Sequence, residues 1–246
     1  MKYLLAGLMS VLLPCLLNAQ EMIPDRPDQT EEVHVVPRGR FQLESGLIIN
    51  GFDSGRSAVI NRSILRYGLS KRVEIGLLTE QGRDRNRYLD ETVQSSYPVA
   101  LRLKAVLLQK HSWLPDITLV GYGQIPVAKN DEGQKAKPSG SVLVAFLNEI
   151  GKKWKLDYTA GFQQEAFGPK FGWQVFTSLH YEISEKTECF AGSYSQFQRD
   201  EHPFHNLNVG IAYYLLETLQ VDIAAGHSIN REDGNGFVTV GFAWLL

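Results

Sequence analysis

The chain of 246 residues carries a formal net charge of −2 at pH 7, and this length suits one large or two small domains. The charges form neither a basic tail nor an acidic block, which argues against a nucleic-acid partner. Beyond an N-terminal leader only Cys189 remains, so we expect no intramolecular disulfide. No later apolar run reaches the ~20 residues of a membrane-spanning helix, which argues against an α-helical membrane protein.

Residues 1–19 have the pattern of a secretory signal peptide. Lys2 supplies the basic start, residues 4–17 are almost wholly apolar, and Ala19 offers a cleavage point. Cys15 raises the alternative of a lipoprotein anchor, but Pro14 stands where such signals carry a small residue. We therefore predict an exported protein that is cleaved near residue 19.

Residues 20–39 are predicted to form an extended N-terminal segment. They are polar, lack a clear hydrophobic period and include Pro24, Pro27 and Pro37. Because proline fixes its own backbone torsion, the segment is expected to be stiff at these positions.

From residue 40 to residue 246, apolar and polar residues alternate with a period of two. Trp154, Leu156 and Tyr158, for example, alternate with Lys155 and Asp157. Such alternation is typical of strands with one apolar and one polar face. Twelve strands are predicted, at residues 40–50, 59–69, 72–82, 98–109, 116–126, 140–151, 153–166, 171–183, 187–198, 204–215, 218–229 and 236–246. Strands 140–151 and 187–198 alternate poorly, and their faces cannot be assigned from the sequence.

Three further features favour a membrane barrel over a soluble β-sandwich. Short connections alternate with longer ones along the chain, as in transmembrane barrels with short periplasmic turns and longer outer loops. The later prolines fall between the predicted strands or at their ends. Aromatic residues such as Trp154 and Trp173 lie near strand ends, where interfacial girdles form. We therefore predict an all-β, twelve-stranded antiparallel transmembrane β-barrel at residues 40–246, in a bacterial outer membrane, with both termini periplasmic.

Several blocks of sequence are similar to a known bacterial family. They are the opening block at 24–30, the blocks at 36–39, 41–46, 65–69 and 72–75, and later blocks at 114–117, 210–215 and 219–222. Together they resemble a transporter-like family named for the meta-cleavage pathway of phenol degradation, over essentially the whole chain beyond the leader. The resemblance implies an outer-membrane barrel of the transporter type. The family name gives a pathway context and does not identify a solute.

The polar face of the predicted barrel carries charged residues, and these are expected to point into the lumen. An Arg or Lys that faces lipid at the membrane midplane would cost ~2–4 kcal/mol. The candidate lumen-lining residues are Glu44, Arg62, Arg66, Glu74, Arg102, Lys104, Asp157 and Asp222. In one interpretation they line a polar passage that selects small solutes. In the other they pair across neighbouring strands and fill the barrel as a structural ion-pair network.

The motif Asp25, Arg26, Pro27 and Asp28 in the N-terminal segment is a candidate lumen plug. We expect it to fold into the lumen from the periplasmic side and to pair with the charges there. The alternative is a solvated periplasmic leader.

The expected function is passive permeation of a small molecule through the lumen, with no enzyme activity, cofactor or metal. A sealed structural or interaction barrel is the first alternative. The second is a lipid-acting enzyme, for which residues 227–230 supply His, Ser and Asn. His227 and Ser228 are neighbours on a predicted strand, so they should point to opposite faces and cannot meet.

The remaining expectations concern the loops and the partners. His202 and His205 fit no metal-ligand spacing and are expected to lie in a solvated loop. The expected partners are outer-membrane lipid, an unidentified small-molecule solute, and the periplasmic chaperones and barrel assembly machinery that act during biogenesis.

Overall fold

The computed structural model describes residues 22–51, 56–86, 91–96, 99–109, 113–127, 135–164, 166–167, 171–199, 202–229 and 236–246. The predicted signal peptide lies outside these residues. The strands are β1 (Phe41–Asn50), β2 (Arg56–Gly68), β3 (Val73–Asn86), β4 (Glu91–Ser96), β5 (Val99–Leu108), β6 (Asp116–Ile125), β7 (Ser139–Ile150), β8 (Trp154–Gln164), β9 (Phe171–Ser184), β10 (Thr187–Gln198), β11 (Phe204–Leu216), β12 (Leu219–Ser228) and β13 (Gly236–Leu245). In the described part of the chain, no helix is long and apolar enough to cross a membrane.

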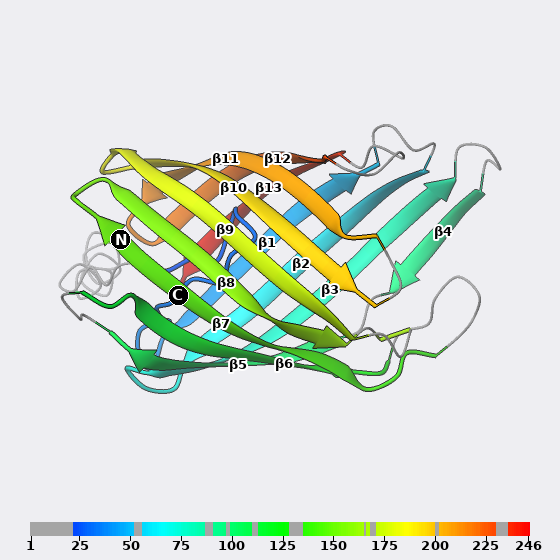
Figure 1. Ribbon diagram of the computed structural model, residues 1–246, viewed down its shortest axis with the longest axis horizontal. Coiled ribbons are helices and arrows are strands. Elements are labelled where there is room, and N and C mark those ends of the chain that lie inside the picture. Colours follow the sequence, from blue (N-terminus) through cyan, green and yellow to red (C-terminus); the bar gives the residue numbers. More distant parts are fainter. Residues whose placement is uncertain are drawn as a thin grey trace, which may run out of the picture.

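The strands form a closed antiparallel barrel (Figure 1). Apart from β4, each strand pairs with the next one along the chain, β3 pairs with β5, and β1 pairs with β13, with Gly46 opposite Gly241. The β2–β3 pairing, with Arg66 opposite Gly76, makes the sheet continuous. The strand β4 pairs only with the outer part of β3, so the other twelve strands make the barrel. The predicted twelve-stranded antiparallel barrel is confirmed.

The predicted strand boundaries need one correction, between residues 83 and 97. The sequence predicts a loop there, whereas β3 continues to Asn86 and pairs with β4 from Glu91 to Ser96. The stretch from Arg83 to Asn86 consists of polar and charged residues, so it lacks the apolar positions by which strands were recognised.

The barrel has two unlike ends. At the end where β1 begins and β13 ends, hereafter the terminal end, the connections are short, such as 185–186 between β9 and β10 and 217–218 between β11 and β12. Gly151 has a φ of 71° in the turn between β7 and β8, a conformation that glycine adopts readily. The opposite end, hereafter the loop end, carries the longer connections, such as 126–138 between β6 and β7.

The outer surface of the barrel is apolar. Outward side chains of β5 such as Leu101 and Leu103 are 55% and 53% exposed. Tilted aromatic pairs lie near both ends, with the Trp154 and Tyr181 ring centroids 4.6 Å apart at the terminal end and the Phe162 and Trp173 ring centroids 4.0 Å apart at the loop end. An apolar band between aromatic girdles is the outer surface that a lipid bilayer requires.

The inner face of β7 explains the weak alternation of this strand. Leu143, Ala145 and Leu147 are buried on the inner face. Val33 of the N-terminal segment packs against Ala145 and Leu147 in one apolar cluster. Both faces of β7 are therefore apolar, which removes the periodic signal.

Candidate functional site: a segment inside the barrel

Residues 22–39 enter and leave the barrel interior at its terminal end (Figure 1). Met22 packs against Ala243 near the end of β13. The chain then reaches the middle of the wall at Arg26 and returns, so that the Gly39 N–H donates to the Gly68 carbonyl at 2.8 Å. The segment is thus a re-entrant loop that contacts the inner faces of several strands.

Asp25 is the point where this segment meets the cationic part of the wall. Its carboxylate lies 2.6 Å from Arg102 Nη1, 3.0 Å from Lys104 Nζ and 3.1 Å from Arg66 Nη1. These three cations come from β5 and β2. Their side chains are fully shielded from solvent, so their contacts with Asp25 are charge-assisted bonds in a region of low dielectric.

Glu74 on β3 completes the cationic cluster from the wall side. Arg66 donates to both of its carboxylate oxygens, at 2.8 and 2.9 Å. Arg102 Nη1 lies 3.2 Å from the same carboxylate, and Arg66 Nη1 lies 2.5 Å from Glu44. The Val36 N–H of the N-terminal segment also donates to Glu74, at 2.8 Å. One carboxylate therefore links β2, β5 and the segment.

Arg26 lies against two glycines on the neighbouring part of the wall, formed by β1, β13 and β12. Its guanidinium donates twice to the Asp222 carboxylate, at 2.8 and 3.2 Å. A Cβ added at Gly46 would stand 2.5 Å from the Arg26 guanidinium, and one added at Gly241 would stand 2.4 Å from it. These two glycines face each other across β1 and β13. The wall is thus flat where the guanidinium lies on it.

The return limb of the segment is held mainly through its acidic residues. The Tyr122 hydroxyl donates to Glu31 at 2.7 Å, and Arg102 also bonds Glu31. Lys104 Nζ donates to the Glu32 carbonyl at 2.5 Å. The segment is therefore bound to β5 and β6 by both side-chain and main-chain groups.

Two acidic groups of the segment, Asp25 and Glu32, keep their charge over a wide pH range. Burial raises the pKa of Asp25, but the neighbouring cations, Arg102 first, lower it by more, so it lies well below its usual range. Burial also raises the pKa of Glu32, but the hydrogen bonds and charge of His34 lower it to about 2. The hydrogen bond to Glu32 in turn raises the pKa of His34, against the effect of burial.

A second charged group lies where the segment meets β8 and β9. His180 Nε2 is 3.1 Å from Asp157 and 3.3 Å from Asp28 of the segment. Its Nδ1 is 2.9 Å from Glu188 on β10, which Lys155 also approaches at 3.3 Å. Three carboxylates thus surround one imidazole.

The eight candidate lumen residues all lie on inner faces, but in different groups. Glu44, Arg66, Glu74, Arg102 and Lys104 form the cluster around Asp25, Asp222 binds Arg26, and Asp157 contacts His180. Arg62 lies apart and pairs with Glu80 at 3.2 Å, with 42% of its side chain exposed.

Sequence reasoning missed several partners of these residues. They are Glu31, Glu32, His34, Tyr122, Lys155 and Glu188. Glu31 and Glu32 follow the motif at 25–28 after two residues. The high local density of acidic residues could therefore have indicated that they also bind the wall. Glu188 carried no such signal, because it lies on the strand whose faces could not be assigned.

Little free space remains beside the segment. A cavity of about 100 Å³ lies between it and the wall, lined by residues that include Asp28, Glu44, Arg62 and Thr239. Small-molecule sites usually measure ~300–1,000 Å³. With the segment in this position, this part of the lumen is too narrow for an ordinary small-molecule ligand.

The lumen is uncharged and polar on part of the wall near the loop end. Asn206 and Ser228 face each other across β11 and β12, and Asn208 follows on the same face. All three are buried, and their side-chain polar atoms include several without a hydrogen-bond partner among the described residues. The wall thus offers amide and hydroxyl groups beyond the charged clusters.

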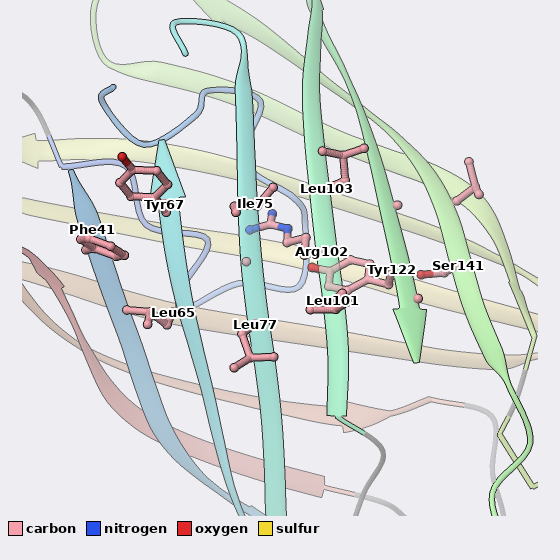
Figure 2. A pocket seen from close by; sticks show the side chains of 14 residues that line it. Phe41, Leu65, Tyr67, Ile75, Leu77, Leu101, Arg102, Leu103, Tyr122 and Ser141 are labelled. Carbon is pink, nitrogen blue, oxygen red and sulfur yellow. The ribbon is translucent and has the colours of Figure 1, made fainter. Parts of the chain in front are cut away.

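A wide apolar groove lies on the outer surface over β2, β3, β5 and β6 (Figure 2). It measures about 740 Å³ and is lined by outward residues such as Leu65, Leu77 and Leu101. A Cβ added at Gly121 or Gly123 on its floor would meet nothing within 4 Å. The groove therefore lies on the lipid-facing surface, although Arg102 and Tyr122 of the inner face also contribute to its lining.

The residues considered for lipid hydrolysis do not form a catalytic arrangement in the described chain. The Ser228 side chain is buried on the inner face, whereas His227 Nδ1 lies 2.6 Å from the Ser228 carbonyl oxygen. Asn230, and Asp200 and Glu201 beside His202, lie outside the described residues. The expectation that His205 lies in a solvated loop is wrong, because His205 lies on β11 and its Nδ1 is 2.7 Å from Ser195 Oγ on β10.

A closed antiparallel barrel with an apolar outside and a charged inside defines the class of outer-membrane β-barrel proteins. Within this class, the chain belongs to the family described as "Putative MetA-pathway of phenol degradation", whose model matches residues 24–246. The resemblance noted in the sequence is thereby confirmed. No protein with a curated description matches the chain.

Solved structures of bacterial outer-membrane proteins share the fold. A channel from Pseudomonas putida F1 is similar with a TM-score of 0.71 and 13% identity, over 92% of this chain and 100% of that chain. The NanC porin is similar with a TM-score of 0.58 and 8% identity, over 83% of this chain and 98% of that one. The KdgM porin in complex with disordered oligogalacturonate is similar with a TM-score of 0.56 and 7% identity, over 82% of this chain and 98% of that one. At these identities the likeness establishes the barrel fold.

Proposed function

We propose that this protein is an outer-membrane channel for the passive permeation of a small solute, and that residues 22–39 are its plug. One observation carries the proposal. The interior is filled by a segment held largely through hydrogen bonds and ion pairs, including the contacts of Asp25 and Arg26. Such contacts can be exchanged for contacts with water when the segment leaves.

The path of the segment supports its removal as a unit. It reaches the barrel wall through Arg40 and β1 at the terminal end, and its two limbs both run toward that end. No strand is inserted into the barrel wall from residues 22–39. The segment can therefore withdraw without breaking the closed sheet.

The orientation of the barrel follows from its connections. Transmembrane barrels have short periplasmic turns and longer outer loops, and the short turns lie at the terminal end. Both termini of the barrel are therefore assigned to the periplasm. The plug enters from the periplasmic side, and the uncharged wall of Asn206, Asn208 and Ser228 lies toward the outside.

The structural relatives agree with a role as a channel. One is described as an outer membrane channel and two as porins. The proposed mechanism is diffusion through the lumen without chemical conversion of the solute. The charged and amide groups of the interior suit a polar solute better than an apolar one.

Deletion of residues 22–29 tests the proposal. This change removes Asp25, Arg26 and Asp28 but leaves every strand intact. We expect the purified variant to give larger and longer-lived conductance steps than the full mature chain in planar lipid bilayers. Boiling-dependent gel migration of both proteins serves as the control for barrel formation. Equal conductance of two folded barrels would contradict the role of the segment as a plug.

A sealed structural barrel is the second candidate, favoured by the complete burial of Arg66, Arg102 and Lys104 among carboxylates. In that case the segment is a permanent part of the core. The deletion would then produce a protein that fails to form the boiling-sensitive barrel, or a folded one that conducts no ions. The same experiment therefore separates the two functions.

A further inference from the structure

We propose that Asp28, Asp157 and His180 form a binding site for a divalent transition cation of the zinc class, which joins the N-terminal segment to the wall. The ligands come from three parts of the chain: the segment, β8 and β9. The site lies apart from the Asp25 cluster, and its capacity to bind a metal does not depend on whether the barrel conducts.

The spacing of the three ligand atoms fits one metal ion. His180 Nε2 lies 3.1 Å from Asp157 Oδ2 and 3.3 Å from Asp28 Oδ2, and ligand atoms of all three residues lie within 4.8 Å of one another. Zinc bonds of ~2.0–2.2 Å at tetrahedral angles hold neighbouring ligand atoms roughly 3.3–3.6 Å apart. Only small side-chain adjustments are needed to place an ion between them.

The second nitrogen of His180 makes the contact expected of a metal ligand. His180 Nδ1 lies 2.9 Å from Glu188 Oε1. A neutral imidazole that donates from Nδ1 presents a lone pair at Nε2, toward Asp157 and Asp28. A carboxylate behind a histidine in this way fixes the tautomer and raises the basicity of the ligating nitrogen.

The surrounding charges leave room for a cation. Lys155 lies 2.9 Å from Glu182 and 3.3 Å from Glu188, so its charge is shared between these carboxylates. Asp28 and Asp157 converge instead on His180. The Thr30 hydroxyl bonds Asp28 and orients it. A divalent ion would neutralise the two aspartates without requiring an imidazolium.

The site is sheltered but reachable. The side chains of His180, Asp28 and Asp157 are 9%, 8% and 10% exposed. Three protein ligands leave a fourth position of a tetrahedral zinc ion for water. Because Asp28 belongs to the segment, a bound ion would resist withdrawal of the plug, a consequence that rests on the proposed function.

Isothermal titration of the detergent-solubilised mature chain with ZnCl₂ tests the site, with MgCl₂ as the comparison ion. We expect one zinc equivalent to bind and magnesium to bind at least tenfold more weakly. His180→Gln should lower zinc affinity at least tenfold. His205→Gln, at a histidine that contacts Ser195 instead, is the matched control and should bind zinc as the unaltered chain does.

Asp157→Asn is the second variant and should also lower zinc affinity at least tenfold, which covers the case in which His180→Gln does not fold. Absence of zinc binding by the unaltered chain, or unaltered zinc binding by a folded ligand variant, would overturn the site. Conductance with and without zinc is measured separately. Zinc binding with lower conductance supports both the site and the plug, whereas zinc binding with unchanged conductance supports the site and contradicts its link to the plug.

Discussion

Glu74 is the residue whose loss should cost the most stability, because it is fully buried and contacts two arginines and the Val36 N–H. Replacing Glu74 by Gln keeps the size of the side chain but removes a carboxylate charge that both Arg66 and Arg102 contact. A buried ion deprived of its partner costs about 3–5 kcal/mol. We expect a loss of that order in the free energy of unfolding, measured by urea titration in lipid vesicles with tryptophan fluorescence.

Arg62→Gln is the control for that variant. Arg62 pairs with Glu80, but the two side chains are 42% and 26% exposed. Exposed ion pairs contribute about 0–1 kcal/mol, so this variant should unfold almost as the unaltered protein does. Equal losses in the free energy of unfolding for Glu74→Gln and Arg62→Gln would show that the ion pairs of Glu74 and Arg62 are screened equally in the lumen.

Gly46 offers a way to displace Arg26 without altering a charge. The three nearest heavy atoms to an added Cβ all belong to the Arg26 guanidinium, at 2.5 Å. Gly46→Ala should therefore move Arg26 away from Asp222 and weaken docking of the segment by about 1–3 kcal/mol, as overpacking usually does. Faster cleavage after Glu31 or Glu32 by a glutamate-specific protease, in the folded barrel, is the expected result.

Gly121→Ala is the matched substitution on the outer surface. A Cβ there meets nothing within 4 Å, so cleavage by the same protease should proceed at the rate of the unaltered protein. If Gly46→Ala and Gly121→Ala are cleaved equally slowly, Arg26 does not lie against Gly46.

At the scale of elements, docking of the N-terminal segment should depend on pH through His34. His34 Nδ1 lies 2.7 Å from Glu32 and Nε2 lies 3.4 Å from Asp116. In the docked segment the hydrogen bond of Glu32, and after it the charge of Asp116 on β6, raise the pKa of His34. The contribution of His34 is therefore complete below the ordinary value of ~6.5 and is lost as the pH rises through the raised value. The segment should thus dock more tightly at pH 5 than at pH 9.

Asp25 and Glu32 of the segment have the opposite pH dependence, and their contributions to docking are lost only at very low pH. The pKa of Glu32 is lowered to about 2 and that of Asp25 lies well below its usual range, so their contributions persist at pH 5 and are lost only as the pH falls through these values. Protease protection of the segment, compared at pH 5 and pH 9, measures the effect. His34→Gln should reduce the difference in protection between pH 5 and pH 9. If that difference is unchanged in the variant, a group other than His34 causes the pH dependence.

Most strands could be predicted from the sequence because lipid and lumen impose opposite polarities on successive residues. The exceptions have local causes. On β7, Ala145 and Leu147 face inward against Val33, so the segment supplies an apolar environment where the sequence pattern predicts a polar one. The hairpin of β3 and β4 lies among polar residues that give no alternating signal.

The candidate site was predictable to a different degree. The sequence places charges such as Arg66 and Arg102 on inner faces, since lipid excludes them. The sequence cannot show that both arginines converge on Asp25, because the contact between Arg102 and Asp25 joins residues 77 positions apart in the chain. The grouping of Asp28 with His180 likewise depends on the barrel register and on the position of the segment.

At the scale of the whole molecule, the barrel consists of a closed wall and an N-terminal segment that we propose can leave the interior. The wall is closed by continuous strand pairing, including β1 with β13. The segment lies inside this wall and is bound to several strands, by Asp25 at β2 and β5 and by Arg26 at β12. Its withdrawal would expose a charged passage that leads to the uncharged wall at the loop end.

The most direct test of this account is the conductance of a barrel whose segment is locked in place. Val33 and Ala145 pack together in a buried cluster, so Val33→Cys and Ala145→Cys, in a background with the free Cys189 changed to Ala, should form a disulfide between segment and wall. We predict little conductance in planar bilayers while the disulfide is intact, and larger steps after a reductant is added. Identical conductance before and after verified reduction would contradict a plug that opens by leaving the wall.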